Sequence, residues 1–275
     1  MKWTKDKIMA RLQEQYNEAL KHFPEDRIVG IFLQGSQNYG LATDESDIDS
    51  KLIVLPTFED ICFARKPVST THICENDEHI DFKDIRLMFQ TFRKQNLNFI
   101  EILFTEYRII NPLYEDLWNE LIAQNELIGR YNLHRAVTTM KGIASEKFHA
   151  LEHRYPSRVE VIDKFGGYDS KQLHHLIRIY DFIINFIEGK EYSICLRPNE
   201  EMAKYLKTIK EFGCEGGLEE ARFLANKYFN DICQIADDFR QNTPDKGNPN
   251  VDILLDNIQT AIIKKSLLIE FGVNV

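Results

Sequence analysis

The stretch that decides the fold is residues 31–55, IFLQGSQNYGLATDESDIDSKLIVL. The apolar run that enters it, residues 27–34 (RIVGIFLQ), is β-branched and aromatic and predicts a buried strand. Gly35-Ser36 interrupts that run. A second strand is predicted over residues 47–55 (DIDSKLIVL), which alternates at first and then becomes solidly apolar.

Asp47 and Asp49 open the second strand. Side chains two positions apart on a strand point to the same face, so we expect these carboxylates to project together while Ile48 points into the core. Two close carboxylates repel each other unless a cation lies between them. Mg²⁺ (or Mn²⁺) suits that position because it takes hard oxygen ligands and keeps sites open for substrate phosphates. The pair therefore predicts a divalent metal site.

Gly35 and Ser36 fit the other half of a phosphoryl-transfer site. Glycine lets the backbone approach a phosphate closely, and a serine hydroxyl can donate to a phosphate oxygen. We expect a helix after Ser36, whose first amides would point at the anion. Tyr39-Gly40 is expected to form a turn, with Gly40 at positive φ.

This spacing resembles the signature of the DNA polymerase β-like nucleotidyltransferase superfamily: Gly-Ser, a gap of about ten residues, then Asp-x-Asp at the head of a strand. In its tighter form, G-S-x-x-Y-G-x(5)-S-D-x-D, it resembles a branch of bacterial and phage predicted nucleotidyltransferases. Two further segments resemble that branch, residues 80–105 (IDFKDIRLMFQTFRKQNLNFIEILFT) and 167–179 (GYDSKQLHHLIRI). The resemblance covers residues 30–180 approximately.

The resemblance implies that Gly35 and Ser36 hold the nucleotide triphosphate and that Asp47 and Asp49 bind two divalent ions. It also implies a third catalytic, metal-binding carboxylate on a later, adjacent strand, which helps to activate the attacking hydroxyl. Asp81 is the first choice for that role.

Asp81 fits because its neighbours Ile80 and Phe82 are apolar, which isolates the carboxylate on the polar face of a strand. Glu78 and Asp84 remain alternatives because alternation alone does not fix the register.

Lys171, His175 and Arg178 lie at i, i+4 and i+7, which places them on one face of a predicted helix. Residues 130–178 contain nine Lys/Arg against five acids, in a chain whose net charge is -9. The resemblance favours a clamp on the nucleotide phosphates or on the acceptor; the plain alternative is a solvated helical face.

The rest of the pattern predicts an α+β fold: a small mixed β-sheet domain with an N-terminal helix over residues 1–111, then an all-α domain over 112–275. A hairpin is predicted over residues 70–82, with its turn at Asn76-Asp77. Beyond residue 112 the amphipathic segments are 113–125, 132–153, 170–188, 199–211, 217–240 and 250–270.

Composition is that of a globular protein, with 43% hydrophobic and 28% charged residues. No apolar run reaches the ~20 residues that a membrane span needs, and the N-terminus is too charged for a signal peptide. We therefore expect a cytoplasmic protein without a membrane partner. The five cysteines include no C-x-x-C pair, which argues against a cysteine-based zinc site.

Together these features predict an enzyme that moves a nucleoside monophosphate from an NTP, such as ATP, to a hydroxyl and releases pyrophosphate. The acceptor would be a nucleic acid end, most plausibly RNA of a tRNA-like kind, or a protein side chain. One alternative is a nucleotide-binding regulatory or interaction protein whose catalysis has lapsed. Another is a metal-dependent sugar transferase, which would leave Gly35-Ser36 unexplained.

Overall fold

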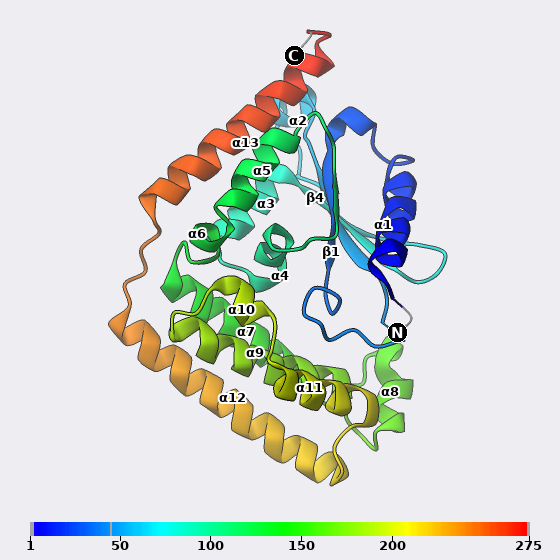
Figure 1. Ribbon diagram of the computed structural model, residues 1–275, viewed down its shortest axis with the longest axis vertical. Coiled ribbons are helices and arrows are strands. Elements are labelled where there is room, and N and C mark those ends of the chain that lie inside the picture. Colours follow the sequence, from blue (N-terminus) through cyan, green and yellow to red (C-terminus); the bar gives the residue numbers. More distant parts are fainter. Residues whose placement is uncertain (1–2, 45, 274–275) are drawn as a thin grey trace. The chain divides into compact units, whose positions relative to one another are not determined.

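The computed structural model describes residues 3–44 and 46–273 (Figure 1). The chain forms two compact units. The first, here the sheet unit, comprises residues 1–38, 43–131 and 247–275, and the second, the helical unit, comprises residues 39–42 and 132–246.

The sheet unit is built on five strands in the order β3-β4-β2-β1-β5. Their bounds are Ile28–Gln34 (β1), Asp49–Val54 (β2), Ser69–Ile73 (β3), His79–Asp84 (β4) and Arg108–Ile110 (β5). The β2–β4 pair is parallel and the other neighbours are antiparallel. The parallel pair arises because β3 and β4 form a hairpin, and its second strand lies beside β2.

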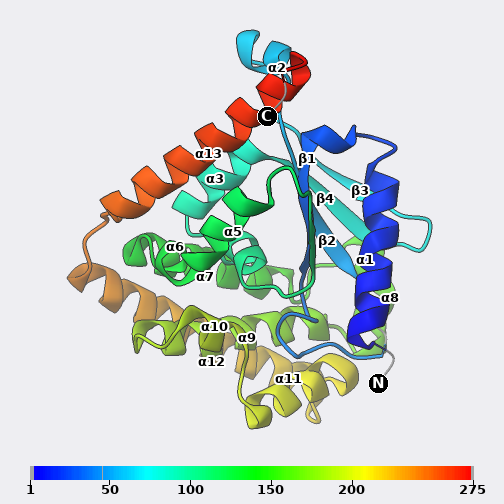
Figure 2. The same ribbon diagram turned by 45° about the horizontal axis from the view of Figure 1, so that its top comes forward.

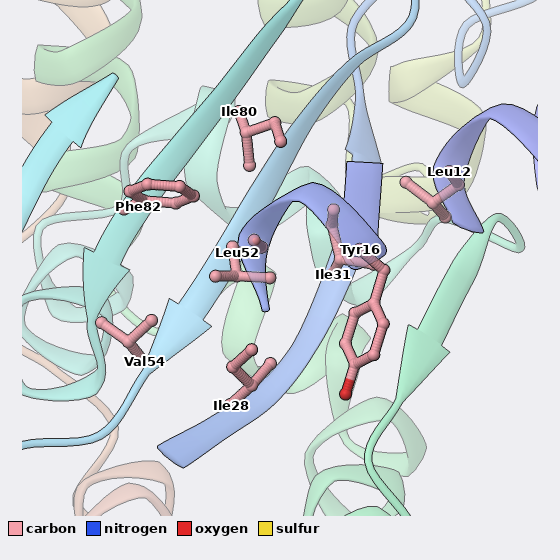
Figure 3. Close-up of a cluster of buried hydrophobic side chains, with 9 residues drawn as sticks. Leu12, Tyr16, Ile28, Ile31, Leu52, Val54, Ile80 and Phe82 are labelled. Atoms are coloured by element: carbon pink, nitrogen blue, oxygen red, sulfur yellow. The ribbon is translucent and has the colours of Figure 1, made fainter. Parts of the chain in front are cut away.

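One face of the sheet packs against α1 (Lys5–Ala19), which begins at the N-cap Thr4. Figure 3 shows side chains from α1 and from β1, β2 and β4 turned toward one another. The labelled members of this cluster are all buried: Leu12, Tyr16, Ile28, Ile31, Leu52, Val54, Ile80 and Phe82. On β2 and β4 the cluster takes the even-numbered residues, so the odd-numbered residues, including Asp49 and Asp81, face away from α1.

The opposite face is covered by helices that come from distant parts of the sequence. Figures 1 and 2 show α3 (Ile85–Arg93), α5 (Glu115–Ala123) and α13 (Pro249–Glu270) on that side. Phe32 of β1 meets Trp118 of α5 there, with ring centroids 4.9 Å apart. The helices of this unit other than α1 are η1 (Glu25–Arg27), α2 (Phe58–Cys62), α3 (Ile85–Arg93), α4 (Leu97–Ile100), η2 (Glu101–Leu103), α5 (Glu115–Ala123), α6 (Asn125–Gly129) and α13 (Pro249–Glu270).

The helical unit is organised around α9 (Ser170–Ile187), which contacts α7, α10, α11 and α12. Its other helices are α7 (Leu133–Ala150), η3 (Pro156–Arg158), α8 (Val159–Lys164), α10 (Tyr192–Leu196), α11 (Glu200–Phe212) and α12 (Gly217–Asn242). Among the helices that the structure describes, none has both the length and the apolar character needed to cross a bilayer.

The structure confirms the predicted α+β class, the two central strands, the hairpin and the long C-terminal helices. The border between the compact units at 131/132 differs from the predicted boundary at 111/112. The difference arises because α5 and α13 pack against each other and α13 also contacts α3, so both ends of the predicted helical domain belong to the sheet unit.

Candidate functional site

Gly35-Ser36 and the acidic pair lie at the same end of two neighbouring strands. β1 ends at Gln34, and Gln34 is the direct cross-strand partner of Asp49 at the start of β2. The Gly-Ser turn therefore follows β1 at the point where Asp49 begins β2, whereas Asp47 precedes the strand, which was predicted to begin there. Local sequence produces this arrangement, because the apolar run of β1 ends at polar residues and β2 begins with polar residues before it becomes apolar.

The helix expected after Ser36 is wrong: residues 36–40 form a turn. Gly35 has φ +87°, a conformation that favours glycine, and the Asn38 amide donates to the Gly35 carbonyl at 3.0 Å. The Asn38 side chain then fixes the turn by donating to the Leu33 carbonyl at 2.9 Å and accepting from Thr105 Oγ1 at 2.7 Å. Gly40 has the positive φ that its turn position predicts, +71°.

Asp47 and Asp49 lie on either side of a buried residue, Ile48. Ile48 is fully buried and packs with Ile8 and Leu33, whereas Asp47 is exposed and the Asp49 side chain is 38% exposed. Both acids are therefore accessible while the residue between them is held in the core. Carboxylate oxygens on an accessible strand end fit a hard divalent ion such as Mg²⁺.

His79 is a neighbour of Asp49 that the sequence analysis did not identify. Asp49 Oδ1 accepts a hydrogen bond from the His79 amide at 3.0 Å, and His79 Nδ1 lies 3.2 Å from the same oxygen. This contact depends on the parallel pairing of β2 with β4, a long-range register for which the local sequence holds no signal.

Asp81 lies on the same face of the sheet as Asp49, but its carboxylate is already engaged. Lys51 is its direct partner across the parallel strands, and Lys51 Nζ lies 3.3 Å from Asp81 Oδ2. Thr71 Oγ1 donates to Asp81 Oδ1 at 2.6 Å. Lys51 Nζ also donates to Gln34 Oε1 at 2.9 Å and lies 4.2 Å from the centroid of the Phe99 ring.

Burial and charge act in opposite directions on this pair. Burial lowers the pKa of Lys51, against the attraction of Asp81. Burial also works to raise the pKa of Asp81, but the Lys51 charge and the Thr71 hydrogen bond hold that pKa below its ordinary value. We infer an ion pair between a charged ammonium and a charged carboxylate.

The alternative third acids have other partners. Glu78 is buried on the α1 side, where its Oε2 accepts from Arg11 Nε at 2.7 Å and from Gln15 Nε2 at 2.9 Å. Asp84 caps α3 and accepts from the Nε and Nη2 of Arg86 at 2.9 and 2.7 Å. Arg86 therefore forms an ion pair with the residue that caps its own helix.

The structure does not gather the three predicted acids into one tight cluster. Within residues 3–44 and 46–273, Asp47, Asp49 and Asp81 do not bring three ligand atoms within 4.8 Å of one another. Asp47 and Asp49 fit a divalent ion by their oxygen chemistry and accessibility, whereas the Lys51 ion pair occupies Asp81.

In the helical unit, α9 carries all three predicted clamp residues. Lys171 is exposed, His175 is partly buried, and Arg178 is only 6% exposed. Burial lowers the pKa of His175 well below its ordinary value, so the ring is neutral. The Arg178 guanidinium lies 4.1 Å from the centroid of the Tyr39 ring.

Tyr39, which follows the Gly35-Ser36 turn in the sequence, contacts α9 through Arg178. It is 5% exposed, and residues 39–42 belong to the helical unit although they lie between Ser36 and Asp47 in sequence. Residues 39–42 are therefore part of the same compact unit as α9, although they follow the Gly-Ser turn in the sequence. Tyr39 was predicted to form a turn, and its contact with Arg178 was not predicted.

Other polar residues near the start of α9 have structural partners. Asp169 caps the helix and accepts from the Nε and Nη2 of Arg158 at 2.7 and 2.8 Å. His174 is buried and its Nδ1 lies 2.9 Å from the Leu206 carbonyl oxygen. These contacts fix the first turn of α9 and hence the position of the side chains that follow.

The fold and the site together define an α+β protein in which a Gly-Ser turn adjoins paired carboxylates at one end of a mixed sheet. No protein-family model matches the chain, and no curated protein matches it. Among solved structures, the chain is similar to a nucleotidyltransferase-like protein from Exiguobacterium sibiricum 255-15. The two are 13% identical with a TM-score of 0.31, over 82% of this chain and 74% of that one.

Proposed function

We propose that the protein is a metal-dependent nucleotidyltransferase that moves a nucleoside monophosphate from an NTP to a hydroxyl and releases pyrophosphate. The observation that carries the proposal is the register of β1 with β2, which sets the Gly35-Ser36 turn beside Asp49. Phosphoryl transfer needs a cradle for the leaving phosphates next to the ligands of a metal, and this strand end supplies the residue types for both.

Each residue has a distinct part in this proposal. Gly35 leaves open space where a side chain would stand, so a phosphate can approach the backbone there. The Ser36 hydroxyl donates to a phosphate oxygen. Asp47 and Asp49 would hold the divalent ion, Mg²⁺ or Mn²⁺, which neutralises phosphate charge when bound.

Asp81 is proposed as the third carboxylate, and its environment limits what it can do. A carboxylate whose pKa is held low is a weak base, so it is poorly suited to take a proton from the attacking hydroxyl. A role in metal binding or in placing the acceptor suits it better. The proposed acceptor hydroxyl belongs to an RNA end or to a protein side chain.

One observation favours a second candidate function, a nucleotide-binding protein without transfer activity. The Lys51 ion pair neutralises Asp81, and the three acids do not converge among the described residues. Such a protein would bind NTP and metal at the same strand end but would not turn the nucleotide over.

The test is a transfer assay with each of the four α-labelled NTPs, Mg²⁺ or Mn²⁺, and cellular RNA and cellular protein as separate acceptors. Label in one acceptor fraction, lost in Asp49→Asn, supports transfer. Asp77→Asn is the matched control, because it makes the same chemical change at an exposed hairpin turn. γ-Labelled NTP must leave the acceptor unlabelled, since a nucleotidyltransferase releases that phosphate.

Equilibrium dialysis with the same NTPs separates the candidates. Binding without transfer supports the second candidate. An absence of both binding and transfer contradicts both, and equal transfer by Asp49→Asn and Asp77→Asn contradicts the assignment of the site.

A further inference from the structure

We propose that Glu18, His22 and His72 form a binding site for one Zn²⁺ ion, separate from the carboxylates Asp47 and Asp49. One ligand atom from each of the three residues lies within 4.8 Å of the others. This inference does not depend on the proposed transfer reaction.

The three residues come from two parts of the sheet unit. Glu18 lies in the last turn of α1, His22 follows in the turn after that helix, and His72 lies on β3 at the edge of the sheet. The His22 amide donates to the Ala19 carbonyl at 3.0 Å, which holds the turn against the helix end. The donors are therefore placed by secondary structure and brought together by the packing of α1 on the sheet.

Their separations approach those of a tetrahedral metal site. Glu18 Oε1 lies 3.6 Å from His72 Nε2. With metal–ligand distances of about 2.0–2.2 Å, the corners of a tetrahedron are about 3.3–3.6 Å apart. The His22 and His72 rings have centroids 4.6 Å apart, and His72 is stacked on Phe82 at 5.8 Å with an interplanar angle of 12°. Because Phe82 is buried, this stacking fixes the orientation of one imidazole before any ion binds.

The donor types select the metal. Two imidazoles and one carboxylate suit Zn²⁺, whereas Mg²⁺ prefers oxygen ligands and keeps several waters. Three protein ligands leave a fourth position for water, and the exposure of His22 gives solvent access to it. The neighbouring cavity, of about 590 Å³, is lined by both Glu18 and His72, and also by Glu75, Glu14 and Arg11. Arg11 pairs with Glu14 and balances its charge, so Glu75 is the lining acid that would favour a cation.

Lys21 is the cation that Zn²⁺ would have to compete with. Its Nζ donates to Glu18 Oε2 at 2.5 Å, whereas the oxygen nearest His72 is Oε1. Both side chains of this ion pair are solvent-accessible, with 69% of Lys21 and 31% of Glu18 exposed, so the ammonium can move into water at little cost. A bound ion would link the end of α1 to the edge strand and stabilise the sheet unit by mass action.

Zinc titration of the metal-free full-length protein tests the proposal, in excess Mg²⁺ so that oxygen-ligand sites are already filled. Calorimetry should detect one equivalent of Zn²⁺, and the melting temperature should rise with added Zn²⁺. His72→Phe and His22→Phe keep an aromatic ring but remove the donor nitrogen, so each should abolish this equivalent. Glu14→Gln is the matched control for Glu18→Gln, because Glu14 lies one turn earlier on α1 and outside the ligand group.

In the presence of a chelator, each variant must first show the melting temperature of the wild type. His22→Phe is the variant least expected to disturb folding, because His22 is exposed and lies outside any helix or strand. The expected result is loss of zinc binding and of the zinc-dependent thermal shift in His22→Phe, His72→Phe and Glu18→Gln. An Asp47→Asn/Asp49→Asn protein should retain both. Zinc binding of unchanged stoichiometry in His22→Phe, or an absence of saturable binding by the wild type, would overturn the proposal.

Discussion

Replacing Lys51 by methionine tests how much the ion pair between Lys51 and Asp81 contributes to folding stability. The Lys51 side chain is 2% exposed and that of Asp81 is 25% exposed, with 3.3 Å between Nζ and Oδ2. Methionine keeps the apolar stem, and its thioether can still contact the Phe99 ring that Lys51 Nζ approaches. The substitution therefore removes the charge with little change of volume.

The two partners should not respond equally, because they differ in burial. Asp81→Asn leaves a buried ammonium without its counter-charge, and we expect it to cost about 3 kcal/mol of folding free energy, the lower end for a broken buried pair. Lys51→Met should cost less, because the remaining carboxylate keeps the Thr71 hydrogen bond and reaches water. At 3.3 Å the attraction is about 5 kcal/mol for an effective dielectric constant of 20, and desolvation opposes it. A coupling energy of about 1–3 kcal/mol is therefore expected between the two substitutions.

Urea unfolding of the two single variants and the double variant measures this coupling. Lys141→Met is the matched control, because Lys141 also pairs with a carboxylate, Asp237 at 2.8 Å, but lies in the helical unit and is more exposed. A coupling below about 0.5 kcal/mol, or a larger loss of stability in Lys51→Met than in Asp81→Asn, would refute the ion-pair reasoning.

The pH dependence gives a second check. The pKa of Lys51 is lower in the folded protein than its ordinary value of 10.5. Between these two pKa values the unfolded chain keeps more protons than the folded protein does, so the free energy of unfolding rises with pH in that window. Lys51→Met should lack this rise. Because the pKa of Asp81 is also lowered, its contribution is present above 3.8 and is lost as pH falls through the folded-state pKa.

Three further predictions concern both units. Ser36→Ala should reduce kcat/KM for NTP by roughly ten- to a hundredfold, the effect of about 1.5–3 kcal/mol from one hydrogen bond to a charged group, and unchanged kinetics would remove Ser36 from the site. Arg178→Lys keeps the charge but loses planar stacking on Tyr39, so the free energy of unfolding should fall by about 1 kcal/mol in urea, and an unchanged value would contradict the stacking of Arg178 on Tyr39. Burial lowers the pKa of His174 from 6.5 to about 4, so its contribution to stability, about 3 kcal/mol, is complete above pH 6.5 and is lost as pH falls toward 4. Circular dichroism of His174→Gln should give a flatter acid profile than wild type, and identical profiles would contradict this assignment.

The sequence predicted those parts of the fold that depend on local pattern. β1 and the second half of β2 are continuous apolar runs, as in strands buried on both faces, and α9 has apolar positions at helical spacing, so the pattern predicts all three elements. The division into units could not be predicted in the same way. α13 buries Val251, Leu255 and Ile258 in the sheet unit, although nothing in its own sequence distinguishes that partner from the neighbouring helices.

In the candidate site, too, short-range sequence predicted some features, whereas others depend on residues far apart in the sequence. The adjacency of Gly35-Ser36 and the acidic pair follows from two consecutive antiparallel strands, which short-range sequence specifies. The turn after Ser36 was not predicted, in part because the Asn38 side chain that fixes it accepts a hydrogen bond from Thr105, far away in the sequence.

The choice among the three candidate third acids depends on the register of β4 against β2, and that register also determines the charge around the chosen acid. Because Ile80 and Phe82 are buried against α1, Glu78 turns toward the same side and pairs with Arg11, whereas Asp81 turns to the face that carries Asp49. The same register that places Asp81 on that face also places Lys51 directly beside it. The position of Asp81 on the same face as Asp49 therefore favours it as the third carboxylate. The ion pair with Lys51 opposes this role, because it already balances the charge that would bind a metal ion. For that reason transfer activity and the Lys51–Asp81 coupling have to be measured on the same variants.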